Sequence, residues 1–137
     1  MKILIAEDDF LSRKLLTKHL STVGEIDIAV NGVEAVNAVQ LELKNNGKYD
    51  LICLDIMMPQ MDGQQALSEI RRLEGFFKLQ REQGAKIFMT TSSSDKDHVV
   101  KAALAGCDAY LIKPITKVRL FGELAKHGLT SVADNFS

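Results

Sequence analysis

The sequence contains few of the residues that mark disulfide-rich, zinc-binding or secreted proteins. It has two cysteines, two prolines and no tryptophan, and the cysteines Cys53 and Cys107 do not form a CxxC pair. We therefore expect both cysteines to be reduced thiols, as in cytoplasmic proteins. The histidines His19, His98 and His127 are scattered, so a zinc site is not expected either.

Long runs of one kind of residue are also missing. Lysine and arginine number 17 against 18 for aspartate and glutamate, and no basic run could follow a phosphate backbone. The first apolar run covers only residues 3–6 before it meets Glu7, which is too short for a signal peptide or a membrane span. These absences predict a cytoplasmic protein that binds neither nucleic acid nor membrane directly.

The length and the apolar content predict one domain. With 137 residues, 46% of them hydrophobic, the chain can build one well-packed core but not two domains. We assign residues 1–128 to this domain and residues 129–137 to a polar C-terminal tail. Since no further domain would follow the tail, we expect a stand-alone domain or one excised from a larger protein.

Short apolar runs alternate with amphipathic stretches along the whole chain. The runs predict strands at 3–6, 26–30, 51–54, 87–91 and 109–112. The stretches predict helices at 10–23, 33–43, 61–73, 95–105 and 117–127, the first with Phe10, Leu11, Leu15, Leu16 and Leu20 facing the core. Connections of this length require parallel pairing. The predicted fold is a doubly wound α/β sheet of five parallel strands, flavodoxin-like with order 2-1-3-4-5 and helices on both faces.

The segment from Glu74 to Gly84 is longer than a connection into the next strand needs. It either extends the third helix or forms a surface excursion. Its neighbouring aromatic residues Phe76 and Phe77 could be an exposed partner site, although large apolar side chains more often fold back onto the core.

Polar residues follow four of the predicted strands. The first strand is followed by Glu7, Asp8 and Asp9, and the third ends at Asp55. The carboxyl ends of parallel strands meet at one edge of a sheet, so these acids are expected to lie together. Clustered carboxylates repel one another unless a cation lies between them, and hard oxygen ligands suit Mg²⁺. We therefore predict a Mg²⁺ site, while Asp8 or Asp9 could also cap the first helix.

A carboxylate at such a site can act as a nucleophile. Asp55 closes the predicted central strand, and an aspartyl phosphate is a known covalent intermediate. Phosphoryl transfer depends mainly on charge stabilisation, which Lys113 after the fifth strand and the metal would supply. Thr91 at the end of the fourth strand could donate a hydrogen bond to the transferred group.

These residues resemble the receiver domain of two-component response regulators, in particular stand-alone receivers of the chemotaxis type, over nearly the whole chain. The resemblance rests on the acids after the first strand, Asp55, the pattern Met-Pro-x-Met-Asp-Gly at 58–63, and Lys113 followed by Pro114. It implies that Asp8, Asp9, Asp55 and the backbone carbonyl of Met57 bind Mg²⁺. It also implies that Asp55 is the phosphoacceptor, that the peptide bond from Lys113 to Pro114 is cis, and that Thr91 and Tyr110 form the switch.

The resemblance implies a function as well. A histidine kinase or a phosphotransfer protein would supply the phosphoryl group, and the domain would catalyse only its own phosphorylation and dephosphorylation. The phosphorylated domain would signal to a downstream protein by changing its binding surface. Met57 occupies a position that tunes the lifetime of the phosphoryl group, and its apolar side chain cannot orient an attacking water. We therefore expect slow self-dephosphorylation.

Two other functions fit part of the pattern. A phosphatase of the haloacid dehalogenase type uses a similar set of residues, but it requires a second acid two positions after the nucleophile, where this chain has Met57. A receiver that binds partners without phosphorylation is the other alternative. The sequence does not identify the cognate kinase, the downstream target or the oligomeric state.

Overall fold

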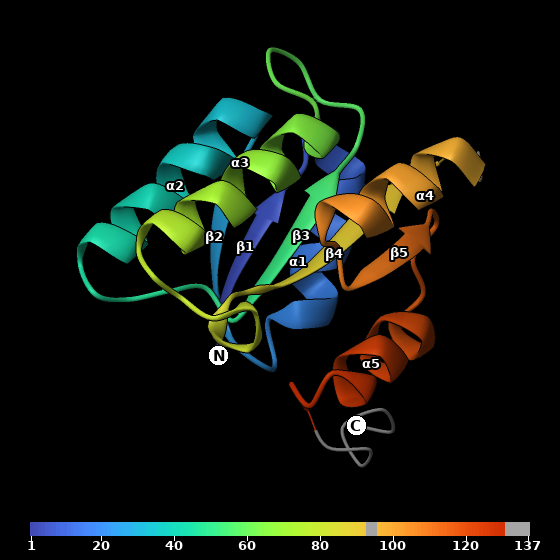
Figure 1. The fold of residues 1–137 in the computed structure, drawn as a ribbon. Helices are drawn as coiled ribbons and strands as arrows, with labels where there is room; N and C mark the ends of the chain where they lie inside the picture. Colours follow the sequence, from blue (N-terminus) through green and yellow to red (C-terminus); the bar gives the residue numbers. More distant parts are fainter. Residues whose placement is uncertain (93–95, 131–137) are drawn as a thin grey trace.

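A computed structural model of the chain describes residues 1–92 and 96–130. Five parallel strands form one sheet in the order β2-β1-β3-β4-β5 (Figure 1). The strands are β1 (Lys2–Ala6), β2 (Glu25–Ala29), β3 (Leu51–Asp55), β4 (Lys86–Thr91) and β5 (Ala109–Ile112). The predicted strand order is therefore confirmed, and each strand matches its predicted range to within a residue.

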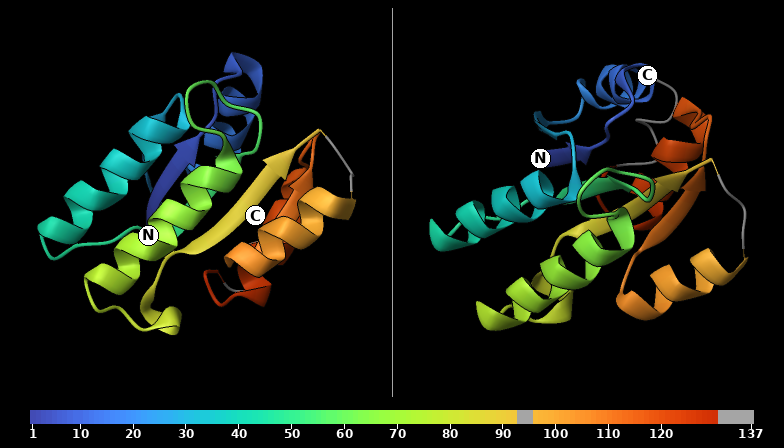
Figure 2. Two further views of the ribbon diagram at one scale, coloured as in Figure 1. Left: turned by 45° about the horizontal axis from the view of Figure 1, so that its top comes forward. Right: turned by 90° about the horizontal axis from the view of Figure 1, so that it is seen from above.

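The helices cover both faces of the sheet. They are α1 (Phe10–Leu20), α2 (Gly32–Lys44), α3 (Gly63–Phe76), α4 (Lys96–Ala105) and α5 (Lys117–Lys126), with a short 3₁₀ turn η1 (Arg81–Gln83) before β4. Figure 2 shows α1 and α5 on one face and α2, α3 and α4 on the other. This doubly wound arrangement is the one that the alternating sequence predicts.

Each face of the sheet has its own hydrophobic core. Strand residues alternate between the two faces, so neighbouring side chains of one strand enter different cores. Leu4, Ile52 and Leu54 pack under α2 and α3, whereas Ile3, Ile5 and Cys53 pack under α1 and α5. All five residues of β3 are buried, which explains its uninterrupted apolar run.

Short polar side chains cap the helices at their N-termini. Asp9, Asn31, Asp62 and Thr116 each accept a hydrogen bond from a backbone N–H in the first turn of α1, α2, α3 and α5. The predicted cap of α4, Asp95, lies outside the described residues.

The predicted core face of α1 is wrong in part. Leu16 and Leu20 are buried, but Phe10 and Leu11 are 61% and 73% exposed and Leu15 is 38% exposed. Only the second half of α1 packs against the sheet closely enough to bury its apolar side chains. The first half lies beside the carboxyl edge of the sheet, where Phe10 contacts the cations of Arg13 and Lys14 instead.

The segment from Glu74 to Gly84 does both things that the sequence allowed. Helix α3 continues to Phe76, after which the chain makes an excursion through η1. Phe77 and Leu79 pack against the core, whereas Phe76 is 73% exposed and meets Phe77 edge to face. The core explanation therefore holds for Phe77 and not for Phe76.

The C-terminal region is described only to residue 130. Leu129 packs against the core under α1 and α5, so the first residue of the predicted tail belongs to the folded domain. Within residues 1–92 and 96–130, no helix is long and apolar enough to cross a membrane.

Candidate functional site

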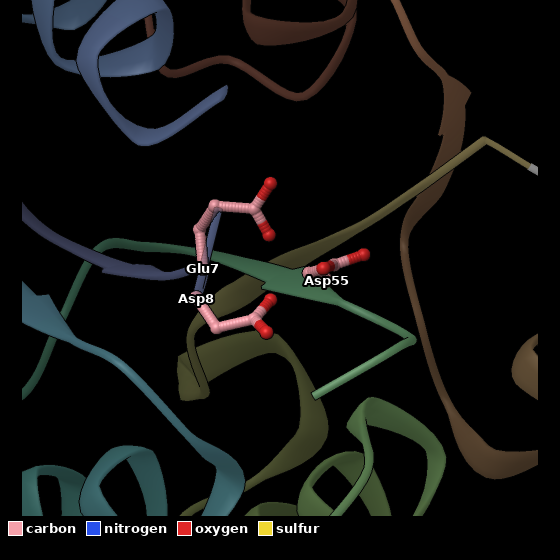
Figure 3. A group of neighbouring side chains, drawn as sticks. All are labelled: Glu7, Asp8 and Asp55. Atoms are coloured by element: carbon pink, nitrogen blue, oxygen red, sulfur yellow. The ribbon is translucent and has the colours of Figure 1, made fainter. Parts of the chain in front are cut away.

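The candidate site lies at the carboxyl edge of the sheet. Asp55 is the last residue of β3, Glu7 and Asp8 directly follow β1, and Lys113 directly follows β5. Glu7, Asp8 and Asp55 each offer a carboxylate oxygen, and these oxygens lie within 4.8 Å of one another. Figure 3 shows the three carboxylates directed toward a common space. The parallel topology thus brings together residues that are far apart in the sequence.

Glu7 is the most buried acid of this group. Its side chain is fully buried, with Oε1 hydrogen-bonded to Lys113 Nζ and Oε2 without a hydrogen-bond partner among the described residues. Burial, and next the contact with the Asp55 carboxylate, raise the pKa of Glu7 to about 8, although Lys113 acts against both. A buried carboxylate with an unpaired oxygen is unusual, and this oxygen is a potential ligand for a cation.

Lys113 joins the acids into one network. Its ammonium contacts Glu7 and lies 3.6 Å from Asp55 Oδ1. Burial lowers the pKa of Lys113, but the hydrogen bond to Glu7 and the charges of both acids outweigh burial, so the pKa is raised overall. The Lys113–Pro114 peptide bond is cis, as the resemblance implied. The Lys113 backbone N–H donates to the Thr91 carbonyl at 2.7 Å, which links the ends of β4 and β5.

Asp9 does not belong to this group of carboxylates. Its Oδ2 accepts a hydrogen bond from the Ser12 N–H at 2.9 Å, and hydrogen bonds from Ser12 lower the pKa of Asp9. The side chain therefore caps α1, the alternative role that the sequence allowed. Glu7 lies with Asp8 and Asp55 where the sequence predicted Asp9. A role for Asp9 as a metal ligand stays a prediction.

The loop after Asp55 is held tightly against the strand. Gly63 donates its N–H to the Ile56 carbonyl at 2.9 Å, and a Cβ on Gly63 would lie 2.3 Å from the Asp55 carbonyl oxygen. Gln60 adopts a positive φ of 67° within the loop. Met57 is 69% exposed, and its N–H donates to Asp55 Oδ1 at 3.4 Å. Met57 thus lies at the mouth of the site, with its side chain largely in solvent.

The two predicted switch residues lie on neighbouring strands. Thr91 is buried at the end of β4 and directly follows Thr90, the register partner of Asp55 at the end of β3. Tyr110 is half-buried on β5 and packs against the core under α2 and α3. Both positions are compatible with the roles that the resemblance implies, although the roles themselves stay predictions.

The residues present fit a bound Mg²⁺. Glu7, Asp8 and Asp55 supply only oxygen ligands, which Mg²⁺ prefers, and the exposure of Asp8 leaves access for water, of which Mg²⁺ keeps several molecules. The unpaired Glu7 Oε2 is an acceptor that such an ion, directly or through water, could satisfy.

Comparison with known proteins shows which family shares this sequence pattern. The family described as the response regulator receiver domain matches residues 3–125. Hybrid signal transduction histidine kinase L of Dictyostelium discoideum is 34% identical over 93% of the chain, and chemotaxis protein CheY of Halobacterium salinarum is 38% identical over 85% of it. The chain spans 87% of CheY but only 7% of the kinase.

The solved structures show the same architecture. The receiver domain of the histidine kinase CKI1 from Arabidopsis thaliana, complexed with Mg²⁺ and BeF₃⁻, superimposes with a TM-score of 0.82. The two chains are 26% identical, and the match covers 94% of this chain and 90% of the other.

Proposed function

This chain belongs to the family of response regulator receiver domains, and on that premise we propose that a phosphoryl group on Asp55 switches its protein contacts. The domain is a signalling module of the two-component type. The main support for Asp55 is its position, because it is the buried acid at the end of the central strand that lies against both Lys113 and two further carboxylates.

We infer that Glu7, Asp8 and Asp55 hold the Mg²⁺ ion. Bound Mg²⁺ would neutralise the acids and stabilise charge on the phosphoryl oxygens. An Asp55 carboxylate oxygen would then attack phosphorus while the bond from phosphorus to the donor histidine nitrogen breaks and its electron pair stays on that nitrogen. Lys113, already beside Asp55, would stabilise the charge of the transferred group.

The upstream partner is inferred from this chemistry. A histidine kinase or a phosphotransfer protein would have to bring a phosphohistidine to Asp55 and would cover the surface beside it. That surface contains a groove of about 320 Å³ lined by Leu11, Ser12, Leu15, Leu16, Lys113, Pro114 and Ile115. The exposed apolar side chains at the start of α1 border this groove, which supports contact with a protein there.

The output is proposed to be a change of protein-binding surface. Thr91 would move toward the phosphoryl group and Tyr110 would follow, so that the surface of α4, β5 and α5 changes. The downstream target is a protein whose identity the chain does not reveal. Two thiols outside any disulfide, Cys53 and Cys107, support a cytoplasmic location.

The phosphatase alternative loses its support, because the family match is to receivers and the exposed residue two positions after Asp55 is Met57 rather than an acid. Phosphorylation-independent binding remains the competing function, and one experiment separates the two. Affinity capture with the protein in Mg²⁺ and beryllofluoride should retain a partner that Asp55→Asn does not retain. A partner held equally by both proteins would contradict the switch.

A further inference from the structure

We infer that Gln64 is a positioning residue that couples helix α4 to Asp55 through one buried hydrogen bond. The inference rests on the proposed function of Asp55 and adds a second route for its signal, separate from Thr91 and Tyr110. Three observations carry it: the contact between α3 and the backbone of Asp55, the link from Gln64 to α4, and an unpaired buried atom in each of the two linked residues.

The first turn of α3 cannot move independently of Asp55. Gly63, the first residue of α3, donates its N–H to the Ile56 carbonyl, and its Cα lies so close to the Asp55 carbonyl that a methyl group would not fit. Backbone atoms in such close contact transmit displacement directly, because packed interiors do not compress. A shift of the Asp55 backbone therefore displaces the start of α3.

Gln64 connects this turn to α4. It is the next residue along the chain, it is only 6% exposed, and its Nε2 donates to the His98 carbonyl at 3.1 Å. His98 lies in the first turn of α4, which begins at Lys96. The side chain of Gln64 therefore joins the N-terminal turns of two helices that follow two different strands of the site.

Each of the two linked residues also has a buried side-chain atom that is unpaired. Gln64 Oε1 and His98 Nδ1 are both buried and have no hydrogen-bond partner among the described residues. Native proteins pair nearly all such atoms, so an unpaired atom in each of the two linked residues requires an explanation. We infer that a second arrangement of α3 and α4 pairs these atoms, because a coupling element requires two arrangements.

The surroundings leave room for such a displacement. A surface groove of about 410 Å³ opens beside the link and is lined by Met61, Gln64, Gln65, Ser68, Glu69 and Lys101. The two helices are therefore not closely packed on this side of the link, which leaves space for a displacement. The hydrogen bond from Gln64 to the His98 carbonyl then transmits the displacement of α3 to α4.

Amide hydrogen exchange with and without Mg²⁺ and beryllofluoride tests the coupling. Peptides from the loop at 56–62 report binding at Asp55, and peptides from α4 report its response. In Gln64→Leu the α4 response should fall by about twofold or more, while the loop response is retained. Gln64→Met is a second variant, in case the branched leucine side chain disturbs folding. Its unbranched side chain is similar in length to glutamine, and it should reduce the α4 response in the same way.

The neighbouring residue provides the matched control. Gln65 lies in the same turn of α3 but is exposed, so Gln65→Leu should respond like the unmodified protein. An α4 response in both Gln64 variants equal to that of Gln65→Leu would overturn the inference, as would an α4 helix that never responds although the loop does. A protein in which neither segment responds would contradict the proposed function of Asp55 and the coupling together.

Discussion

The acidic residues at the carboxyl edge of the sheet differ in burial and in their contacts. Asp55 is buried and lies against Lys113, whereas Asp8 is exposed and open to water. Burial and the neighbouring Asp55 carboxylate raise the pKa of Glu7 to about 8. A pKa of about 8 keeps Glu7 mostly protonated at neutral pH, and a divalent cation would favour the ionised form of Glu7 by offsetting its charge.

Met57 is expected to set the lifetime of the phosphoryl group. Its exposed thioether side chain lies beside Asp55 and cannot hold a water molecule in line with phosphorus. Met57→Asn should accelerate dephosphorylation roughly fivefold, since one added hydrogen bond to water is worth about 1 kcal/mol. The decay of phosphorylated protein, followed by intact mass, measures this rate.

The control is Met57→Leu, which keeps an apolar side chain and should decay as slowly as the unmodified protein. Fast decay in all three proteins would mean that Met57 does not protect the phosphoryl group.

Glu7 shows what the sequence could and could not predict about the site. Parallel strands bring their carboxyl ends together, so the edge of the sheet and Asp55 could be predicted without a structure. The sequence alone could not predict which of the acids after β1 turn toward Asp55, because successive residues point in different directions as the strand ends. Glu7 is the first residue after a fully buried run, a signal that favours an inward side chain, whereas Asp9 lies where a helix cap is required.

At the scale of elements, the loop between β3 and α3 fixes the position of Asp55. Two glycines allow its close packing: Gly63 lies against the Asp55 carbonyl, and Gly32 at the start of α2 lies against the Met61 carbonyl. A Cβ at either position would come within 2.4 Å of a backbone oxygen. The loop is therefore held between two helices by contacts that only glycine permits.

Gly63→Ala should destabilise the protein and disturb the site. The added methyl group must displace the Asp55 carbonyl, and overpacking of this kind costs about 1–3 kcal/mol. Urea unfolding followed by circular dichroism measures the free energy of unfolding.

Gly75 lies in the same helix, and outside that helix's own backbone and its two chain neighbours no atom of the described residues lies within 4 Å of its hypothetical Cβ. Gly75→Ala should therefore raise the free energy of unfolding by up to about 1 kcal/mol through helix propensity. If both alanine variants were stabilised, the close contact at Gly63 would not constrain the loop.

Elements also differ in how well patterns predict them. Helix α3 could be predicted, because its apolar positions repeat regularly and it packs along the sheet. The exposed start of α1 could not be predicted from the sequence. The spacing of apolar residues predicts which face of a helix is buried, but it does not predict how far along the helix the sheet extends.

For the whole molecule, the end of the sheet opposite the site is held by a buried arginine. Arg71 of α3 donates to the carboxylates of Glu74 and Asp108 and to the carbonyls of Ala85 and Gly106. These partners precede β4 and β5, so one side chain connects α3 to the starts of two strands. Local patterns do not predict this network, because it joins residues separated by as many as 37 positions.

Arg71→Met should destabilise the whole domain. Its side chain is only 12% exposed, and removing the guanidinium leaves Glu74 without its ion pair and Asp108 with only the more exposed Arg81. Breaking a buried pair in this way costs about 3–5 kcal/mol. Thermal or urea unfolding should show one cooperative transition at a lower midpoint.

Arg72 is the matched control. It pairs with Glu69 in solvent, with side chains 63% and 40% exposed, so Arg72→Met should change the free energy of unfolding by about 1 kcal/mol or less. If both variants lost the same free energy of unfolding, the buried Arg71 network would stabilise the domain no more than an exposed ion pair does.

The central claim is that Asp55 accepts a phosphoryl group at a Mg²⁺ site shared with Glu7 and Asp8. Incubation with a small-molecule phosphodonor, followed by intact mass and peptide mapping, tests it most directly. The account predicts a gain of one phosphoryl group on Asp55, abolished in Asp55→Asn and by removal of Mg²⁺, and strongly reduced in Asp8→Asn. Phosphorylation that persists in Asp55→Asn at the unmodified protein's level, or that does not require Mg²⁺, would contradict it.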